Sequence, residues 1–102
     1  MHKMTSMTRI SPKVKEAVAI RDRETCVLCG GRGFPNAHVV RRSQGGMGIE
    51  KNIVCLCYKC HKEFDEGTRE QKERAYVRIV AHLKGFYPDW SKGDMIYKKG
   101  DI

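Results

Sequence analysis

The amino-acid sequence predicts one small α+β domain that a cluster of metal-binding cysteines holds together. Three observations favour this fold class: helical apolar spacing towards both ends of the chain, two β-prone runs between those stretches, and two Cys-x-x-Cys pairs. A chain of 102 residues is long enough for one domain and too short for two ordinary ones. Because so small a domain buries limited apolar surface, we expect it to need a staple.

The N-terminal part of the chain is predicted to be a leader followed by a helix. Residues 1–10 show no apolar periodicity, so we expect a flexible leader there and a single domain over residues 11–102. Ser11 suits an N-cap and Pro12 suits the first helical position. Apolar residues then recur at helical spacing, which predicts a helix that ends near residue 23.

Two β-prone runs in the middle of the chain predict a hairpin with a long connection. The first run covers residues 38–40 and the second covers residues 52–57. Residues 43–48 lie between them and are rich in glycine, so we expect this connection to be flexible.

The C-terminal part is predicted to contain two helices and an irregular tail. Residues 58–65 predict a short helix that Gly67 ends, and residues 70–84 predict a longer helix with one apolar stripe and a stop at Gly85. His82 lies off that stripe and is expected on the surface. The helix and tail together cover residues 70–102, and the tail mixes aromatic with basic residues. Such a tail either lines a nucleic-acid groove or packs its aromatic side chains on the body, and we favour the second interpretation.

The cysteine spacing predicts a structural zinc site. Cys26 and Cys29 form one Cys-x-x-Cys pair, Cys57 and Cys60 form another, and the hairpin between them can bring the four thiolates to one tetrahedral ion. A redox-active pair is the main rival interpretation, but two pairs joined by a hairpin favour a structural metal. Cys55 lies on the second β-prone run without a knuckle turn, so we interpret it as a small apolar filler.

Charge and hydropathy restrict the compartment and the partners. No apolar stretch has the length of a signal-peptide core or a membrane span, so we expect a cytoplasmic protein with reduced thiols and no membrane partner. The formal net charge of +8 favours polyanionic partners, of which nucleic acid is the natural candidate. Basic side chains that only solubilise the surface are the alternative.

A few polar residues beyond the cysteines suggest chemistry. His38 and Asn52 stand at the two ends of the hairpin connection, and the turn after Cys57 is expected to carry His61 to the same side. His61, with Asp65 one helical turn later, could hold a second ion against a phosphate, while His38 deprotonates a water molecule. The amide of Asn52 would tie the loop down and hold the ring of His38.

The order and spacing of these residues resemble the HNH endonuclease family, most closely the small HNH proteins of bacteriophages and prophages. The similarity spans roughly residues 22–67, which form the motif core. It is carried by Cys26-x-x-Cys29, His38-Val39-Val40, Arg42-Ser43-x-Gly45-Gly46, Asn52-Ile53-Val54-x-Leu56-Cys57-x-x-Cys60-His61 and Phe64-Asp65.

The resemblance implies a ββα-metal core, related to the treble clef and also called a His-Me finger, that hydrolyses DNA to a 5′-phosphate and a 3′-hydroxyl. It implies that His38 activates water, that Asn52 steadies the loop and that His61 binds a catalytic divalent cation (Mg²⁺, Mn²⁺, Ni²⁺ or Zn²⁺). The four cysteines match the structural zinc site of many members. DNA is the implied partner, together with other phage DNA-processing or packaging proteins.

The chain departs from the family pattern at Ala37, where members usually carry an Asp, Glu or His that binds the metal. Asp65, Asn36 or water would then complete the coordination.

Four polar residues are expected to contact phosphates and to position DNA without reading its sequence. They are Arg41, Arg42 and Ser43 beside the proposed base, and Arg32 in the first knuckle. Two other functions stay open: a non-catalytic, zinc-stabilised DNA-binding module, and an electron-transfer protein whose thiolates hold iron.

Overall fold

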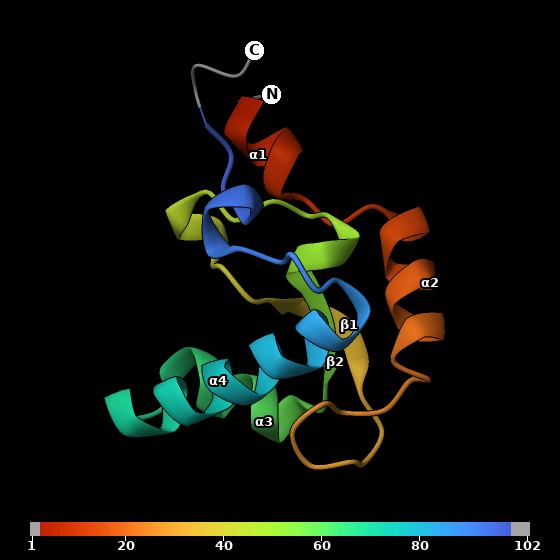
Figure 1. Ribbon diagram of the computed structural model, residues 1–102, viewed down its shortest axis with the longest axis vertical. Coiled ribbons are helices and arrows are strands. Elements are labelled where there is room, and N and C mark those ends of the chain that lie inside the picture. Colours follow the sequence, from red (N-terminus) through yellow and green to blue (C-terminus); the bar gives the residue numbers. More distant parts are fainter. Residues whose placement is uncertain (1–2, 99–102) are drawn as a thin grey trace.

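The computed structural model describes residues 3–98 and confirms an α+β arrangement around a two-stranded antiparallel sheet (Figure 1). Its helices and strands are α1 (Lys3–Thr8), α2 (Pro12–Arg21), β1 (Phe34–His38), β2 (Ile53–Leu56), α3 (Tyr58–Glu66) and α4 (Arg69–Phe86). Short 3-10 turns are η1 (Arg42–Gln44), η2 (Glu50–Asn52) and η3 (Lys92–Met95). None of the helices in this described part has the length and apolar character needed to cross a membrane.

Helix α2 begins where the sequence predicts and ends slightly earlier. The Ser11 hydroxyl accepts a hydrogen bond from the Val14 N–H at 3.2 Å, which confirms the predicted N-cap. The helix stops at Arg21 because Arg23 and Glu24 adopt left-handed backbone angles, with φ of 56° and 50°. This turn directs the chain into the first cysteine knuckle.

The first strand is displaced from its predicted position. Residues 38–40 were expected to form it, but β1 ends at His38, which pairs with Ile53 of β2. The Val39 N–H still donates to the Asn52 carbonyl, at 2.9 Å. The Val40 N–H donates instead to the Asn52 side-chain oxygen, also at 2.9 Å. The backbone ladder therefore stops because a side chain replaces the next backbone acceptor.

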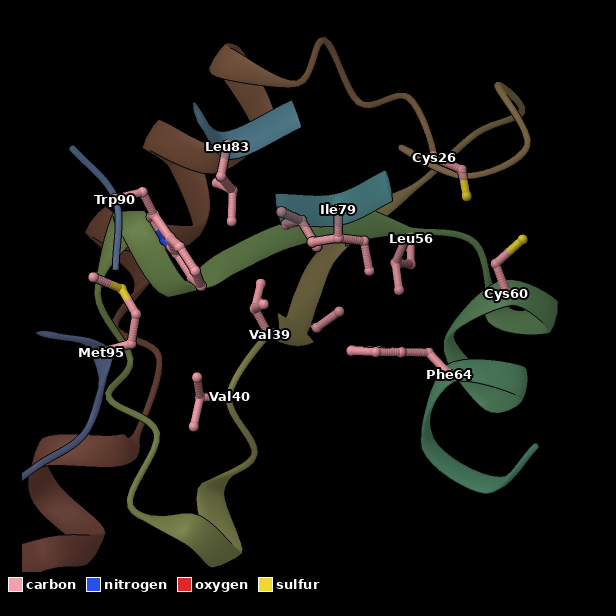
Figure 2. Packing of buried hydrophobic residues seen from close by; sticks show 12 residues of the cluster. Cys26, Val39, Val40, Leu56, Cys60, Phe64, Ile79, Leu83, Trp90 and Met95 are labelled. Atoms are coloured by element: carbon pink, nitrogen blue, oxygen red, sulfur yellow. The ribbon is translucent and has the colours of Figure 1, made fainter. Parts of the chain in front are cut away.

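Strand β2 is buried on both faces, whereas in β1 only Ala37 is buried. Alternate residues of β2 point to opposite sides, so Val54 and Leu56 join the larger core while Ile53 and Cys55 pack against α2. Figure 2 shows the larger core, to which the hairpin, α3, α4 and the C-terminal segment all contribute. Its labelled residues are Cys26, Val39, Val40, Leu56, Cys60, Phe64, Ile79, Leu83, Trp90 and Met95.

Both ends of the described chain hold the long hairpin connection. Its residues 43–48 were predicted to be flexible, but the Gly48 N–H donates to the Met7 carbonyl and the Met47 N–H to the Met95 carbonyl. A Cβ on Gly46 would lie 1.7 Å from the Val40 carbonyl oxygen, and one on Gly48 would lie 2.1 Å from that of Arg9. These two glycines therefore permit close backbone approach, which the sequence analysis had interpreted as flexibility.

The structure of the two ends of the described chain can be compared with the predictions made for them. Residues 3–8, which were predicted to belong to a flexible leader, form α1, and Thr8 is only 2% exposed. At the other end α4 continues through Gly85 to Phe86. The expected packing of the aromatic tail is confirmed for Trp90, which is buried and donates its indole N–H to the Lys51 carbonyl. Residues 1–2 and 99–102 lie outside the described residues.

A buried ion network joins α2, β2 and α4. Both Asp22 carboxylate oxygens accept hydrogen bonds from Arg21, at 2.8 and 3.0 Å, and one also accepts from the Cys55 N–H. The His82 Nε2 lies 2.7 Å from the other oxygen. His82, which was expected on the surface, is therefore half-buried and anchors α4 to the end of α2.

Candidate functional site

The four paired cysteines form one cluster that can hold a metal ion. Their sulfur atoms all lie within 4.8 Å of one another, and the four residues are Cys26, Cys29, Cys57 and Cys60. In Figure 2 the sulfurs of Cys26 and Cys60 face each other at the edge of the core. Four thiolates at this spacing fit a single tetrahedral ion. The predicted metal cluster is confirmed at this level.

Backbone N–H groups donate hydrogen bonds to several of these sulfurs. Cys57 is the N-cap of α3 and its sulfur accepts from the Cys60 N–H at 3.4 Å, while the Cys29 sulfur accepts from the Gly31 N–H at 3.4 Å. Burial opposes ionisation of Cys26, but backbone N–H groups donate to its sulfur and lower the pKa of this thiol to about 7. The thiolate, which is the metal-binding form, is therefore favoured at Cys26, whereas burial and the neighbouring thiols raise the pKa of Cys60.

Cys55 lies outside this cluster, as predicted. It is 0% exposed and packs with Val18 and Ile53 in the smaller core. Burial raises the pKa of its thiol to about 11, so this cysteine stays protonated and inert at neutral pH.

A pocket of about 500 Å³ lies where the N-terminal segment, the end of β1, the following loop and α3 meet. We call it the basic pocket, and it is lined by Arg9, Ile10, Lys15, Asn36, His38, Arg41, Arg42, Ser43, His61 and Asp65. Most of the predicted site residues other than the four cysteines therefore converge here. The predicted residues Asn52 and Arg32 do not line it.

His38 enters the basic pocket from the end of β1. Its Nε2 atom lies 2.7 Å from the Thr8 carbonyl oxygen. Because a carbonyl can only accept, the Nε2 atom carries the proton and Nδ1 keeps the lone pair. Burial lowers the pKa of His38 below 6.5, and the positive charges of Arg42 and His61 act in the same direction. The ring is therefore neutral and able to accept a proton at neutral pH.

His61 and Asp65 face the pocket from one side of α3. The His61 Nε2 and the Asp65 Oδ2 are 3.1 Å apart, as expected for residues one helical turn apart. Both side chains are partly exposed, at 31% and 44%. An imidazole and a carboxylate together fit a divalent cation that keeps water in its remaining positions. Ala37 is 0% exposed and supplies no ligand, whereas the neighbouring Asn36 lines the pocket.

Asn52 ties the loop from behind the pocket. Its side chain is 0% exposed, accepts from the Val40 N–H, and donates to the carbonyls of Val40 at 3.1 Å and Met47 at 2.8 Å. These bonds close the loop between Val40 and Met47, as the sequence analysis expected of this amide. The expectation that it also holds the ring of His38 is wrong, because its three hydrogen bonds all go to the backbone of Val40 and Met47 and it does not line the pocket that His38 enters.

Arginines from the loop make the pocket positive. The Arg41 guanidinium donates to the carbonyls of Phe64 and Asp65 at the end of α3, and the Arg42 Nε donates to the Thr8 hydroxyl at 3.3 Å. With Arg9 and Lys15 on the same pocket, a polyanion would meet several cations there. Ser43 is exposed beside them.

Arg32 was predicted to contact the same phosphates and lies elsewhere. Its guanidinium sits 5.6 Å from the centre of the Phe34 ring. Phe34 pairs with Leu56 at the end of the hairpin remote from His38. Arg32 therefore does not line the basic pocket, because closeness to the knuckle in the sequence does not fix which end of the strand a side chain covers.

Four residues of the site were not predicted from the sequence: Thr8, Arg9, Ile10 and Lys15. Thr8 acts through its backbone carbonyl, which any residue carries, so its identity gives no signal. Arg9 and Lys15 look like ordinary solvated charges in the sequence. Only the docking of α1 and α2 beside the hairpin makes them neighbours of His38.

Comparison with known proteins adds no assignment to these observations. No protein-family model matches this chain, and no curated protein or solved structure is significantly similar to it. The basis for assigning a function is therefore the chemistry of the basic pocket and of the cysteine cluster.

Proposed function

We propose that this protein is a metal-dependent endonuclease that hydrolyses DNA phosphodiester bonds, with His38 as the general base. The observation that carries the proposal is the convergence of His38, His61 and Asp65 on one positively charged pocket. A proton acceptor, a pair of cation ligands and phosphate-binding cations are the three components that phosphodiester hydrolysis needs. The resemblance of the motif residues to HNH endonucleases supports the same reaction.

His38 performs the proton transfer. Its Nε2–H is engaged by the Thr8 carbonyl, so Nδ1 accepts a proton from a water molecule in the pocket. The water oxygen forms a bond to phosphorus as the bond from phosphorus to the 3′-oxygen breaks. The 3′-oxygen then takes a proton from solvent, which leaves a 5′-phosphate and a 3′-hydroxyl.

His61 and Asp65 would hold the catalytic cation, for which Mg²⁺, Mn²⁺, Ni²⁺ and Zn²⁺ are the candidates. When bound, such an ion neutralises charge on the phosphate and on the leaving oxygen. Asn36, which lines the pocket, would supply an amide oxygen in place of the ligand that Ala37 lacks. The exposed rims of His61 and Asp65 leave room for water and substrate.

The structural ion belongs in the cysteine cluster, and zinc suits it best. Four thiolates around one tetrahedral ion fix the start of α3, so they also fix His61, the residue after Cys60. On this proposal β1, β2 and α3 form a ββα-metal core. On the basis of the motif resemblance, the proposal also includes a phage origin, action in the cytoplasm, and partners among phage DNA-processing or packaging proteins.

Binding is expected to depend on charge more than on base sequence. Arg41, Arg42 and Ser43 line the basic pocket and reach the phosphate backbone, which carries no direct sequence information. The long helix α4 lies outside the residues that line this pocket, so no recognition helix accompanies the proposed reactive centre.

A plasmid assay tests the proposal. Supercoiled plasmid is incubated with the zinc-loaded protein and Mg²⁺, Mn²⁺ or Ni²⁺, and we expect nicking that requires the added cation. His61→Ala should abolish the cation-dependent nicking. Lys62→Ala changes an exposed neighbour on α3 that lies outside the pocket, and it should leave the nicking unchanged. DNA binding without cleavage under every cation would favour a non-catalytic DNA-binding module and contradict the enzyme.

A further inference from the structure

A second pocket adjoins the basic pocket. It measures about 620 Å³ and lies between the hairpin loop, α3 and α4. Val39, Val40 and Phe64 give it an apolar floor, and Tyr76 and Val77 of α4 form one wall. We call it the apolar pocket. None of the proposed hydrolysis residues His38, His61 and Asp65 lines it.

The two pockets meet at Arg41. This side chain lines both, and its guanidinium is fixed by the consecutive carbonyls of Phe64 and Asp65, at 3.2 and 3.0 Å. Phe64 lines the apolar pocket and Asp65 lines the basic pocket. A chain of nucleotides with one phosphate in the basic pocket would therefore bring a neighbouring nucleotide over Arg41 to the apolar pocket.

The chemistry of the apolar pocket suits a base attached to phosphates. Arg41, Lys72 and Lys92 supply cations around it, against one carboxylate from Glu73. Glu73 is itself paired with Arg69 at 3.1 Å, which reduces its repulsion of an anion. Val77 is 66% exposed, so its apolar surface is accessible to a ligand. Aromatic and apolar side chains beside cations are the usual components of a site that stacks single-stranded bases.

We propose that the apolar pocket binds an unpaired DNA base next to the phosphate held in the basic pocket. The inference rests on the proposed nuclease function and adds a substrate preference to it. In a duplex the faces of a base are covered by its neighbours, so only an unpaired or extruded base can offer a face to the half-buried Tyr76 and the exposed Val77. The protein therefore prefers DNA with unpaired nucleotides, such as single strands, flaps or gaps, over continuous duplex.

The test compares binding of short fluorescein-labelled single-stranded and duplex DNA by anisotropy, without added divalent cation. The full-length, zinc-loaded protein is expected to bind the single strand more tightly. Val77→Glu places a negative charge at an exposed helical position in the pocket wall, and it should weaken single-strand binding about tenfold, as expected for loss of one stacked base. Duplex binding should change much less.

Two further variants make the result specific. Lys92→Glu changes the pocket from η3 instead of α4, so it repeats the test if Val77→Glu fails to fold. Lys62→Glu changes the same charge on an exposed part of α3 that lines neither pocket, and it should leave the ratio of single-strand to duplex affinity unchanged. A matched loss with Lys62→Glu would overturn the inference, because the effect would then reflect net charge alone.

The outcomes separate this inference from the proposed function. If the wild-type protein nicks plasmid but Val77→Glu and Lys92→Glu keep the wild-type affinity ratio, the apolar pocket has another occupant and only the base-binding inference is wrong. If the wild-type protein binds neither DNA, both proposals fail.

Discussion

The imidazole of His38 lies 2.7 Å from the backbone carbonyl oxygen of Thr8, 30 residues earlier in the chain. This contact joins the end of β1 to the end of α1 and decides which ring nitrogen is free. The N-terminal segment, which was predicted to be a leader, therefore fixes the tautomer of the proposed base. A hydrogen bond from one ring nitrogen to a carbonyl is a common way to fix the reactive tautomer of a histidine.

The pH dependence of cleavage follows from the environment of His38. Burial lowers the pKa of the ring below 6.5, so the neutral, active form predominates at neutral pH. The cleavage rate should be flat near neutrality and should fall as the pH drops through this lowered pKa, because protonation removes the Nδ1 lone pair. Single-turnover rates measured across pH 5 to 8 at constant ionic strength check this, on the scale where histidine titrates. A rate that rises on acidification would contradict a general-base role.

Loss of the structural ion should unfold the domain. The affinity of a four-thiolate zinc site corresponds to about 10–16 kcal/mol, which is comparable with the whole stability of a small domain. Cys57→Ser should therefore lose both bound zinc and the far-ultraviolet circular dichroism of the folded protein. Cys55→Ala changes a cysteine two residues away that lies outside the cluster, and it should retain one zinc per chain. A folded, zinc-free Cys57→Ser protein would show that the cluster is dispensable.

Two arginines that lie beyond opposite ends of β1 should contribute differently to DNA affinity. Arg42 lines the basic pocket, whereas Arg32 stacks on Phe34 at the other end of the hairpin. Arg42→Ala should weaken DNA binding and reduce the slope of log affinity against log salt by about one, while Arg32→Ala should leave both nearly unchanged. Anisotropy titrations over a series of salt concentrations provide the measurement. Equal effects of the two substitutions would argue against a localised DNA site.

The buried carboxylate of Asp22 should be a major determinant of stability. Its side chain is 0% exposed and that of its partner Arg21 is 6% exposed, so Asp22→Asn leaves a buried guanidinium without its counter-charge. We expect a loss of about 3–5 kcal/mol in the free energy of unfolding, measured by urea denaturation at neutral pH. Glu73→Gln, which breaks the exposed ion pair with Arg69, should cost less than about 1 kcal/mol. Comparable losses would mean that Asp22 is solvated in solution.

The lowered pKa of Asp22 also determines how the free energy of unfolding depends on pH in the acid range. Burial alone would raise the pKa of Asp22, but hydrogen bonds from Arg21, the Cys55 N–H and His82 outweigh burial and lower the pKa below 3.8. The ionised form is therefore favoured in the folded state. Its contribution to stability is fully present above pH 3.8 and is lost as the pH falls through the lowered value.

The parts of this fold that local chemistry dictates are visible in the sequence. The Ser11 cap, the two cysteine pairs and the spacing of His61 and Asp65 on one helix turn depend on residues close together in the chain, and all three arrangements occur in the structure. The apolar stripe of α4 likewise buries Ile79 and Leu83. Residue spacing and motifs therefore predicted the metal cluster and six of the ten residues that line the basic pocket, with Asn36 as an alternative metal ligand.

The parts that depend on long-range backbone contacts could not be predicted in the same way. The displacement of β1 follows from the Asn52 side chain, which replaces a backbone acceptor for Val40. The contact of Thr8 with His38 uses a main-chain carbonyl, and the glycines at 46 and 48 serve close approach to other backbone segments. The sequence marks Asn52 and Gly46 as motif residues but does not give the backbone segments that they meet, and the contacts of Thr8 and Gly48 leave no local pattern.

The most direct measurement of the central claim is the single-turnover rate of DNA cleavage by the zinc-loaded wild-type protein and by His38→Ala with the same divalent cation. Removing a general base typically costs a factor of about 10²–10⁴, so the account predicts a loss of that size with zinc content and circular dichroism unchanged. Cleavage by His38→Ala at the wild-type rate would contradict it, because the basic pocket would then hydrolyse DNA without its proposed base.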